Sequence, residues 1–323
     1  MAVYGILAWP RLEGLPEAEQ KSGESSLALG RLAQFALANF SRRRRYNKSS
    51  LIVWYYGHMS NLVSRPVVAV IPHYNMPQTL VSLVVQVIAQ QYDAIYVLDD
   101  HSTTCDIEEV VAPFGSAVNL VVGAENLGAG PNRNRILEAD PKNLRGAILH
   151  FIDADCEILT DNVPETARKL FSDRKVGAVG GLISNSNGAQ MEFNYFPRFS
   201  WSGGLSGMLM MAGKQMPRPL QRFVSDYPNP HVPPVAKNVF AVAEANMLIP
   251  FDTFASVNGF DDALRFAEAQ DLGFKLEAKG LTVRFDPIIA VKHHMVLLPD
   301  RKRVRYLLQS FLHLARKYGM SLR

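Results

Sequence analysis

AILHFIDADCEIL, residues 147–159, decides which fold this sequence adopts. Five of the six positions from Ala147 to Ile152 are apolar, and two carboxylates, Asp153 and Asp155, follow at once. A short and almost continuous apolar run is typical of a strand buried on both faces, as in the centre of a parallel sheet. In an open α/β sheet, ligands bind beyond the carboxyl ends of such strands. The stretch therefore predicts an α/β protein with a ligand site at residues 153–155.

Asp153 and Asp155 are the first candidate site residues. Two carboxylates one residue apart repel each other unless a positive charge lies between them. A hard divalent cation with oxygen ligands meets this need, and such cations often share their coordination shell with substrate phosphates. The alternative is that both aspartates only cap the turn after the strand, because Asp-x-Asp alone is a weak pattern.

Apolar runs and helix-period segments alternate through the middle of the chain. This alternation predicts a Rossmann-like, mostly parallel, doubly wound sheet with helices on both faces. Strands are expected at 67–75, 94–103, 117–124, 147–152, 176–183 and 281–294, and helices at 79–91, 107–114, within 126–139, and at 163–171, 252–257, 267–278 and 301–323.

A nicotinamide cofactor is not expected. The Gly-rich fingerprint of dinucleotide folds follows the first strand, and here that position reads PHYNMPQ, without a glycine. The stretch Asn126–Gly130 lies after the third strand and lacks the full spacing.

The chain divides into a main domain with additions. Residues 1–64 read as a partly helical N-terminal appendage, which includes four consecutive arginines at 42–45. The main domain is expected at 65–295, with an irregular insertion at 186–235, and a basic amphipathic helix at 296–323 follows it. The arginine run is typical of a solvated helix end, and the alternative is contact with anionic lipid or nucleic acid.

Composition narrows the class of protein. The chain has 323 residues, of which 48% are apolar and 20% charged, enough for a large core. Its two cysteines cannot form a disulfide framework, no apolar run is long enough to span a membrane, and the N-terminus is a poor signal peptide. A cytoplasmic protein is therefore expected. The net charge of +4 is modest but unevenly placed along the chain. No nucleic-acid partner is expected.

Five motifs taken in order resemble the family 2 glycosyltransferases of the GT-A fold. The resemblance covers about Val67 to His294, roughly two-thirds of the chain. Each motif alone is weak, but five in the family's order make a specific signal. They are VAVIPHYN (68–75), VLDDHST (97–103), NLGAGPNRN (126–134), FIDADCEIL (151–159) and NGFDDALRFAEAQDLGFKLEAKG (258–280).

The resemblance implies a site for a nucleotide-sugar donor, with UDP as the expected nucleotide. Asp99 or Asp100 can accept hydrogen bonds from the uracil or ribose, and Arg133 lies near the nucleotide. Asp153 would contact the ribose or a metal-bound water. The full expected set for the donor is Pro72, Tyr74, Asn75, Asp99, Asp100, Asn126, Gly128, Arg133 and Asp153.

The same resemblance makes Asp155 the direct ligand of Mn²⁺ or Mg²⁺. The ion would neutralise the diphosphate as it leaves. A histidine after the last strand often completes the shell in the family, so His293 and His294 are both candidates. A histidine without any ligand is the alternative.

The catalytic base is where this sequence departs from the family. Members of the family carry the motif Glu-Asp-x-Asp-Leu here, and the first Asp of the motif is the base. In this chain Ala269 stands at that position. Glu268 is the favoured replacement and Asp271 the second choice. Asp261 or Asp262 could also reach the site, or activity could be lost.

The predicted function is metal-dependent, inverting and non-processive transfer of one sugar to a hydroxyl acceptor. The acceptor would be a glycan, a lipid-linked molecule or a protein, and the basic segments could contact the inner face of a membrane. The Gln-x-x-Arg-Trp signature of processive synthases is absent. The alternatives are a catalytically silent glycosyltransferase-like binding module and a nucleotidyltransferase of related fold.

Overall fold

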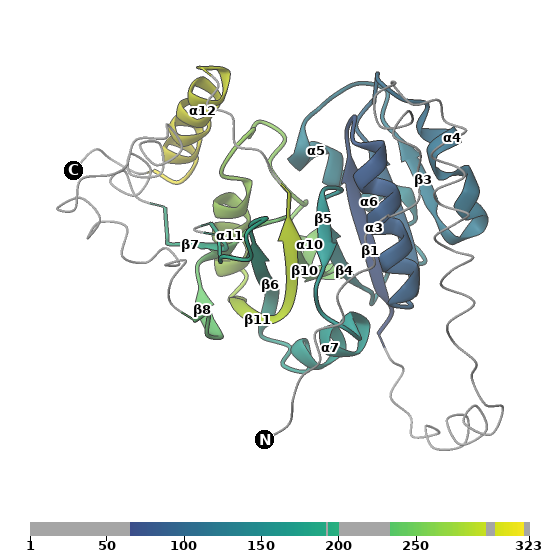
Figure 1. Ribbon diagram of the computed structural model, residues 1–323. Coiled ribbons are helices and arrows are strands. Elements are labelled where there is room, and N and C mark those ends of the chain that lie inside the picture. Colours follow the sequence, from purple (N-terminus) through teal and green to yellow (C-terminus); the bar gives the residue numbers. More distant parts are fainter. Residues whose placement is uncertain (1–64, 192, 200–232, 295–300, 320–323) are drawn as a thin grey trace.

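The computed structural model describes residues 65–191, 193–199, 233–294 and 301–319. Its centre is one mixed, mostly parallel sheet with the strand order β3-β2-β1-β4-β10-β6-β11-β5. Helices pack on both faces of this sheet (Figure 1), so the predicted α/β architecture is confirmed. The predictions for residues 1–64 and for most of the insertion at 186–235 lie outside the described residues.

Four parallel strands in the order β3-β2-β1-β4 form the half of the sheet that comes first in the chain, and β3 (Asn119–Val122) lies at its edge. β1 (Val67–His73) pairs in parallel with β2 (Ala94–Asp99) on one side and with β4 (Ile148–Ile152) on the other. All residues of β1 and β4 are buried, as their apolar runs predict. The register aligns the carboxyl ends of the strands at one edge of the sheet.

An antiparallel strand in the middle of the sheet is not predicted by the sequence. β10 (Asn246–Pro250) lies between β4 and β6 (Val176–Ser184) and is antiparallel to both. β6 then pairs in parallel with β11 (Thr282–His293). Because β10 runs in reverse, its first residues lie at the edge where β4 ends.

The other elements complete the layers and connect the strands. The remaining strands are β5 (Cys156–Ile158), β7 (Tyr195–Phe196), β8 (Lys237–Val239) and β9 (Ala241–Val242). The helices are α3 (Pro77–Ala89), α4 (Ile107–Val111), a 3₁₀ helix (Ala112–Ala117), α5 (Ala129–Asn134), α6 (Ile136–Ala139), α7 (Val163–Leu170), α10 (Phe251–Ser256), α11 (Glu268–Ala278) and α12 (Arg301–Lys317).

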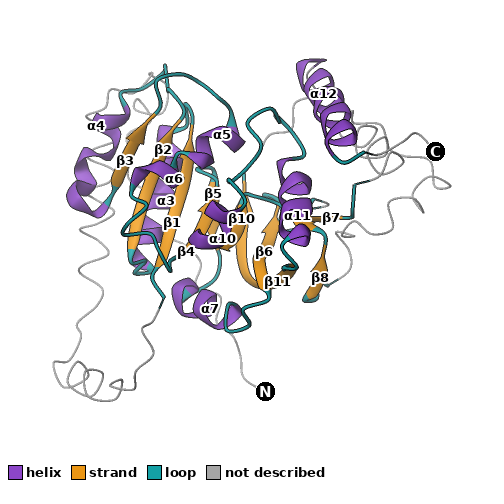
Figure 2. Ribbon diagram, turned by 180° about the vertical axis from the view of Figure 1, so that it is seen from behind, coloured by secondary structure: helices purple, strands orange, loops and turns teal. Residues whose placement is uncertain are grey.

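Alternate residues of β1 belong to two separate hydrophobic cores, one on each face of the sheet. Ala69 and Ile71 pack with α3 and α4 on one face, and Val68 and Val70 belong to the core under α6, α10 and α11 on the other. The view from behind shows this second set of helices in front of the sheet (Figure 2). Strand side chains alternate between faces, so buried residues at every position require cover on both sides.

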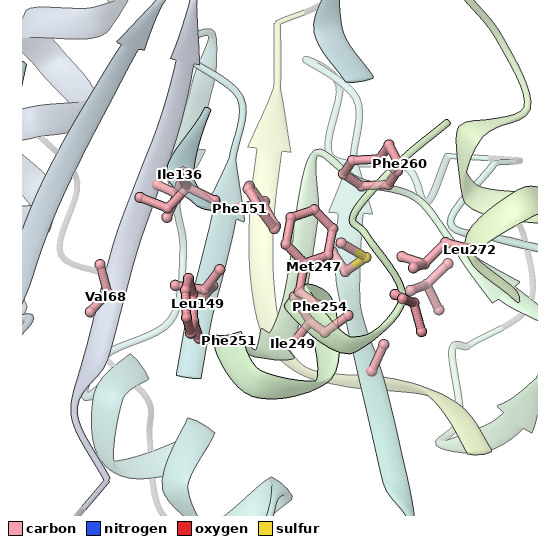
Figure 3. Close-up of a cluster of buried hydrophobic side chains, with 14 of the residues drawn as sticks. Val68, Ile136, Leu149, Phe151, Met247, Ile249, Phe251, Phe254, Phe260 and Leu272 are labelled. Atoms are coloured by element: carbon pink, nitrogen blue, oxygen red, sulfur yellow. The ribbon is translucent and has the colours of Figure 1, made fainter. Parts of the chain in front are cut away.

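Three phenylalanines join the second core to the segment that follows β10 (Figure 3). The ring of Phe151 on β4 lies 5.3 Å from that of Phe254 and 6.1 Å from that of Phe260, both in edge contacts. The helix α10 is followed by a left-handed turn, because Asn258 and Gly259 have positive φ and the Gly259 amide donates to the Phe254 carbonyl. The packing fixes the start of the loop that leads to α11.

The glycine pair in β6 marks a close approach of chain segments, as expected for glycine inside a strand. A Cβ at Gly181 would lie 2.3 Å from both Asn246 Nδ2 and the Ile289 carbonyl oxygen. A side chain there would therefore separate β6 from its neighbours β10 and β11.

A polar network lies inside the sheet at His150. The Asn246 amide donates to the carbonyls of Leu182 and Ile289 at 3.0 and 3.2 Å, so its oxygen is left to accept from His150 Nε2 at 2.8 Å. The Tyr92 hydroxyl then donates to His150 Nδ1 at 2.7 Å. The imidazole is neutral in this arrangement, and complete burial lowers its pKa to about 4.

We expect His150 to make the fold sensitive to mild acid. The unfolded chain protonates this histidine near the ordinary histidine pKa of 6.5, whereas the folded chain does so only near 4. Unfolding free energy should therefore fall by up to ~1.4 kcal/mol per pH unit as pH drops through this window, and the loss should level off below it. Urea unfolding curves collected between about pH 7 and about pH 4 measure the slope. His150→Gln should show a shallower slope, and an equal slope in both proteins would contradict the assignment.

The helix α12 packs beside α11 through a small separate core. Its buried residues Leu307, Phe311 and Leu314 contact Leu264 and Phe274. Figure 1 shows α5 and α12 at the upper edge of the sheet, where β11 ends. None of the described helices has the length and apolar character needed to cross a membrane.

Candidate active site

Asp153, Asp155 and His293 converge at the carboxyl edge of the sheet. The two aspartates follow β4, and His293 is the last residue of β11, which pairs with β5 opposite Cys156. His293 Nε2 lies 2.9 Å from Asp155 Oδ1 and 3.9 Å from Asp153 Oδ2. Burial lowers the pKa of His293, but the hydrogen bond to Asp155 and the charges of both aspartates outweigh it and raise the pKa.

The donor set suits a divalent cation. The ligand atoms of Asp155, Cys156 and His293 lie within 4.8 Å of one another. Cys156 is the poorest ligand of the three, because hard cations such as Mn²⁺ and Mg²⁺ prefer oxygen ligands to sulfur. A carboxylate and an imidazole remain, which fit Mn²⁺ or Mg²⁺ completed by diphosphate oxygens and water.

His294 lies outside this group. Its side chain is 42% exposed, and its Nε2 is 3.6 Å from Glu157 Oε2 rather than near Asp155. Alternation along the end of β11 turns the two histidines to opposite sides. Of the two candidate ligands, the structure brings only His293 to the aspartates.

Arg133 lies at the centre of a group of carboxylates. The residue is 4% exposed, and its Nη2 donates to Asp153 Oδ1 at 2.5 Å. Burial lowers the pKa of this guanidinium, but the charges of Asp153, Glu244 and Glu268 raise it above its usual value. Its Nε finds no hydrogen-bond acceptor in the described part of the chain.

Glu268 joins this group from α11. A Cβ at Gly130 would lie 3.1 Å from Glu268 Cγ, which places this side chain against α5, one turn before Arg133. Burial raises the pKa of Glu268, and the charges of Arg133 and Arg265 partly offset the effect. A carboxyl with a raised pKa is a better proton acceptor near neutral pH.

Glu244 is a member of the group that sequence reasoning missed. It lies between β9 and β10, and burial, followed by repulsion from Glu268, raises its pKa to about 7. The available signal was a single acid in AVAEANMLIP, residues 241–250, an otherwise almost apolar segment.

The structure does not bring Asp271 to Arg133. Its fully buried carboxylate binds Lys275 at 3.0 Å, Lys317 at 2.7 Å and the Tyr318 hydroxyl at 2.7 Å. Lys317 also pairs with Asp261 at 2.6 Å, and with His313 it holds the pKa of Asp261 below its usual value despite burial. These contacts tie α12 to the segment around Glu268.

Asp262 is engaged with α5. Its Oδ1 accepts from the Asn134 amide at 2.8 Å, and that amide also donates to the Phe260 carbonyl at 3.0 Å. Asn134 therefore fixes the loop between α10 and α11 against α5.

The Asp99–Asp100 pair shapes the donor-side loops through internal hydrogen bonds. Asp99 accepts from His73 Nδ1 at 2.8 Å and from the Ser102 hydroxyl at 2.6 Å, and these bonds lower its pKa although burial raises it. Asp100 accepts from the amides of Leu127 at 2.9 Å and Gly128 at 2.8 Å. Both carboxylates are almost fully buried, so they stabilise the loops by hydrogen bonds from inside the protein.

The remaining predicted donor residues lie on these loops. Asn75, with φ of 55°, accepts from the amides of Thr103 at 2.8 Å and Thr104 at 3.0 Å. The Asn126 side chain donates to the Asp100 carbonyl at 3.2 Å, and Gly128 has φ of 88°. Pro72 pairs with Leu98 in the sheet, and Tyr74 is 41% exposed.

Residues 68–204 match the family described as Glycosyl transferase family 2. One similar structure is GalNAc-T7 with UDP, GalNAc and Mn²⁺, with a TM-score of 0.51 and 17% identity over 72% of this chain and 44% of that one. Another is the mannosyltransferase PcManGT from Pyrobaculum calidifontis with GDP-Man and Mn²⁺, with a TM-score of 0.51 and 17% identity over 90% of this chain and 75% of that one. This chain thus spans less than half of the GalNAc-T7 chain. No functionally curated protein is significantly similar to it in sequence.

Proposed function

We propose that this chain, whose residues 68–204 match glycosyl transferase family 2, moves single sugars from a nucleoside diphosphate sugar to a hydroxyl acceptor. The observation that carries the proposal is the convergence of Asp153, Asp155 and His293 at one sheet edge. The two similar structures contain UDP or GDP-Man together with Mn²⁺, which supports a diphosphate donor. We favour UDP as the nucleotide.

The donor side is built from Asp155, His293 and Asp153. Asp155 and His293 would hold Mn²⁺ or Mg²⁺, which supplies Lewis-acid neutralisation of the leaving diphosphate. Arg133 orients Asp153 through their 2.5 Å bond, so that the other carboxylate oxygen can accept from a ribose hydroxyl. Asp99 and Asp100 keep the flanking loops in place below the nucleotide.

The acceptor side is built from Glu268. The acceptor oxygen forms a bond to the anomeric carbon while the bond from that carbon to the diphosphate oxygen breaks, and the leaving oxygen keeps the electron pair. The acceptor's proton passes to the Glu268 carboxylate. Attack opposite the leaving group inverts the anomeric configuration. Ala269 is 3% exposed in the core, so this position contributes nothing to the chemistry.

The test combines binding with turnover. Thermal-shift titrations with UDP and GDP, each with Mn²⁺, Mg²⁺ or EDTA, should show metal-dependent stabilisation by one nucleotide. A panel of nucleotide sugars should then identify a donor that the protein hydrolyses slowly in the absence of acceptor. Stabilisation without hydrolysis or transfer would favour a silent binding module, and no response to any nucleoside diphosphate would overturn the proposal.

We further propose that the acceptor lies at an anionic membrane surface, and that α12 contacts this surface. Besides Lys317, which pairs with Asp261 and Asp271, the helix sequence contains five Lys or Arg residues and no acidic residue. Leu308 and Leu312 are exposed one turn apart on its outer side. Glycan, lipid-linked and protein acceptors could all be presented there. An amphipathic basic helix binds such a surface through apolar burial and charge attraction.

Leu308→Glu combined with Leu312→Glu should weaken vesicle binding more than tenfold, because each buried leucine contributes about 1.5–3 kcal/mol. Sedimentation with phosphatidylglycerol vesicles, and with neutral phosphatidylcholine vesicles for comparison, measures the effect. Leu159→Glu is a matched control, since Leu159 is 53% exposed after β5. Deleting residues 301–323 is a poor test, because it would expose Leu264 and Phe274. Equal binding by the double variant would refute the contact.

A further inference from the structure

The buried Arg133 has a hydrogen-bond donor that no described residue satisfies. Its Nη2 is used by Asp153, but its Nε–H has no acceptor within the described ranges although the residue is 4% exposed. Leaving a buried donor unpaired destabilises a protein, and the cost is larger for a charged group. Such a group is typical of a place where a ligand atom completes the hydrogen bonding.

The backbone at Glu244 is fixed beside the donor site. The Asp153 amide donates to the Ala245 carbonyl at 3.3 Å, and the next residue, Asn246, pairs with Ile152 in the sheet. The antiparallel direction of β10 therefore starts this strand where β4 ends. Glu244 reaches the carboxyl edge for that reason, and its position depends on the sheet and not on a free loop.

The group holds more negative than positive charge. Asp153 from β4, Glu244 from the β9–β10 turn and Glu268 from α11 all act on the Arg133 guanidinium. Arg265, from the loop before α11, adds a second positive charge near Glu268. Since Asp153 already takes Nη2, the two glutamates are the carboxylates of the group that Arg133 does not bind directly.

A hydroxyl group is the ligand that suits this arrangement. Its oxygen can accept from Arg133 Nε–H, and its own proton can be donated to a carboxylate. A phosphate would meet repulsion from two glutamates, and an ammonium would meet repulsion from Arg133. When no acceptor is bound, water can satisfy the same groups.

On the basis of the proposed function, we propose that Glu244 is a second catalytic carboxylate on the acceptor side, which shares with Glu268 the proton released by the acceptor hydroxyl. The acceptor oxygen lies between Arg133 Nε and the two glutamates. As its bond to the anomeric carbon forms and the bond to the diphosphate breaks, its proton moves to one glutamate, and the second glutamate stabilises the protonated form by a hydrogen bond. The glutamate pair then releases the proton to solvent.

The pairing of Glu244 with Glu268 supplies a base to this chain, which has Ala269 at the position of the family's base. A pair of neighbouring carboxylates titrates as a unit, because ionising both costs repulsion. Repulsion from Glu268 raises the pKa of Glu244 further after burial, to about 7, close to the pH at which a base works best.

The experiment compares Glu244→Gln, Glu268→Gln and the double variant, with the donor found in the hydrolysis screen. Glu244→Gln should bind UDP with Mn²⁺ as the wild type does, but lose about tenfold to a hundredfold in kcat. Removal of its charge should also lower the pKa of Glu268, so the acidic limb of the kcat profile should move to lower pH. The double variant should lose less than the product of the two single losses, because both residues serve one proton transfer.

Glu277→Gln is the matched control, since Glu277 lies on α11 but pairs with Arg198 on the surface. If this control and the wild type are active and Glu244→Gln matches them in kcat and pH profile, the inference fails and the proposed function stands. Weakened UDP binding by Glu244→Gln would assign the residue to the donor and also overturn the inference. If the wild type turns over no donor, both fall together.

Discussion

Asp155→Ala is expected to abolish Mn²⁺-dependent nucleotide binding. Among the described residues, Asp155 is the only carboxylate within 3 Å of His293 Nε2, so its loss removes the anionic half of the proposed ligand pair. Loss of groups that merely orient a metal ligand already costs about 10–100-fold in affinity, and loss of the ligand itself should cost on the order of a hundredfold or more. The stabilisation that UDP gives in the presence of Mn²⁺ should disappear.

The measurement is the shift in melting temperature on adding UDP, with Mn²⁺ and with EDTA, rather than the melting temperature itself. His293 loses a partner in this variant, so the absolute stability will change as well. Glu157→Ala is the control, because it removes a carboxylate two residues away that pairs with Lys292 and His294 instead. A normal Mn²⁺-dependent shift in Asp155→Ala would refute the assignment of the metal site.

Glu268→Gln is expected to retain donor binding and to lose turnover by a factor on the order of 10² or more. Glutamine keeps the size and the contact with Gly130 but cannot take up the acceptor's proton. The loss should appear in kcat with little change in the Kd for UDP and Mn²⁺, because Asp155 and His293 are untouched. Transfer assays at saturating donor separate the two constants.

Asp271→Asn distinguishes the two carboxylates proposed from the sequence. Because Asp271 binds Lys275, Lys317 and Tyr318, its loss should lower the melting temperature and should affect kcat much less than Glu268→Gln. Full activity of Glu268→Gln with a large loss in Asp271→Asn would reverse the assignment and would require the C-terminal helix to move during the reaction.

The fold was predictable where local pattern and burial agree. β1 and β4 are buried on both faces, and their sequences are therefore nearly continuous apolar runs. The sequence of α3 shows the helical spacing of its buried face, at Leu80, Val84 and Val87. β10 was missed because NMLIP is five residues long and begins with an asparagine. That asparagine is polar because it completes the His150 network, a contact made across the sheet and not along the chain.

The convergence of residues in the candidate site could be predicted where those residues follow strands. Asp153, Asp155 and His293 come at strand ends, so topology alone brings them to one edge. Sequence could not separate His293 from His294, since only the pairing of β11 with β5 decides which one faces Asp155. It also missed Glu244, because the direction of β10 puts this lone acid at the site. Lys317, one of the partners of Asp271, lies 46 residues away on α12, beyond the reach of any local pattern.

Lys317 on α12 binds both Asp261 and Asp271, and these two ion pairs bear on how readily the segment around α11 unfolds locally. The bond to Asp261 joins residues 56 positions apart in the sequence, and the bond to Asp271 joins residues 46 positions apart. By contrast, β1, β2 and β4 are held together by continuous ladders of backbone hydrogen bonds. A long chain segment that is closed by few contacts gains conformational entropy when those contacts break. This gain favours local opening of the segment. Amide exchange should therefore reach the first turn of α11, which carries the proposed base Glu268, well before β4, which leads to the proposed metal site.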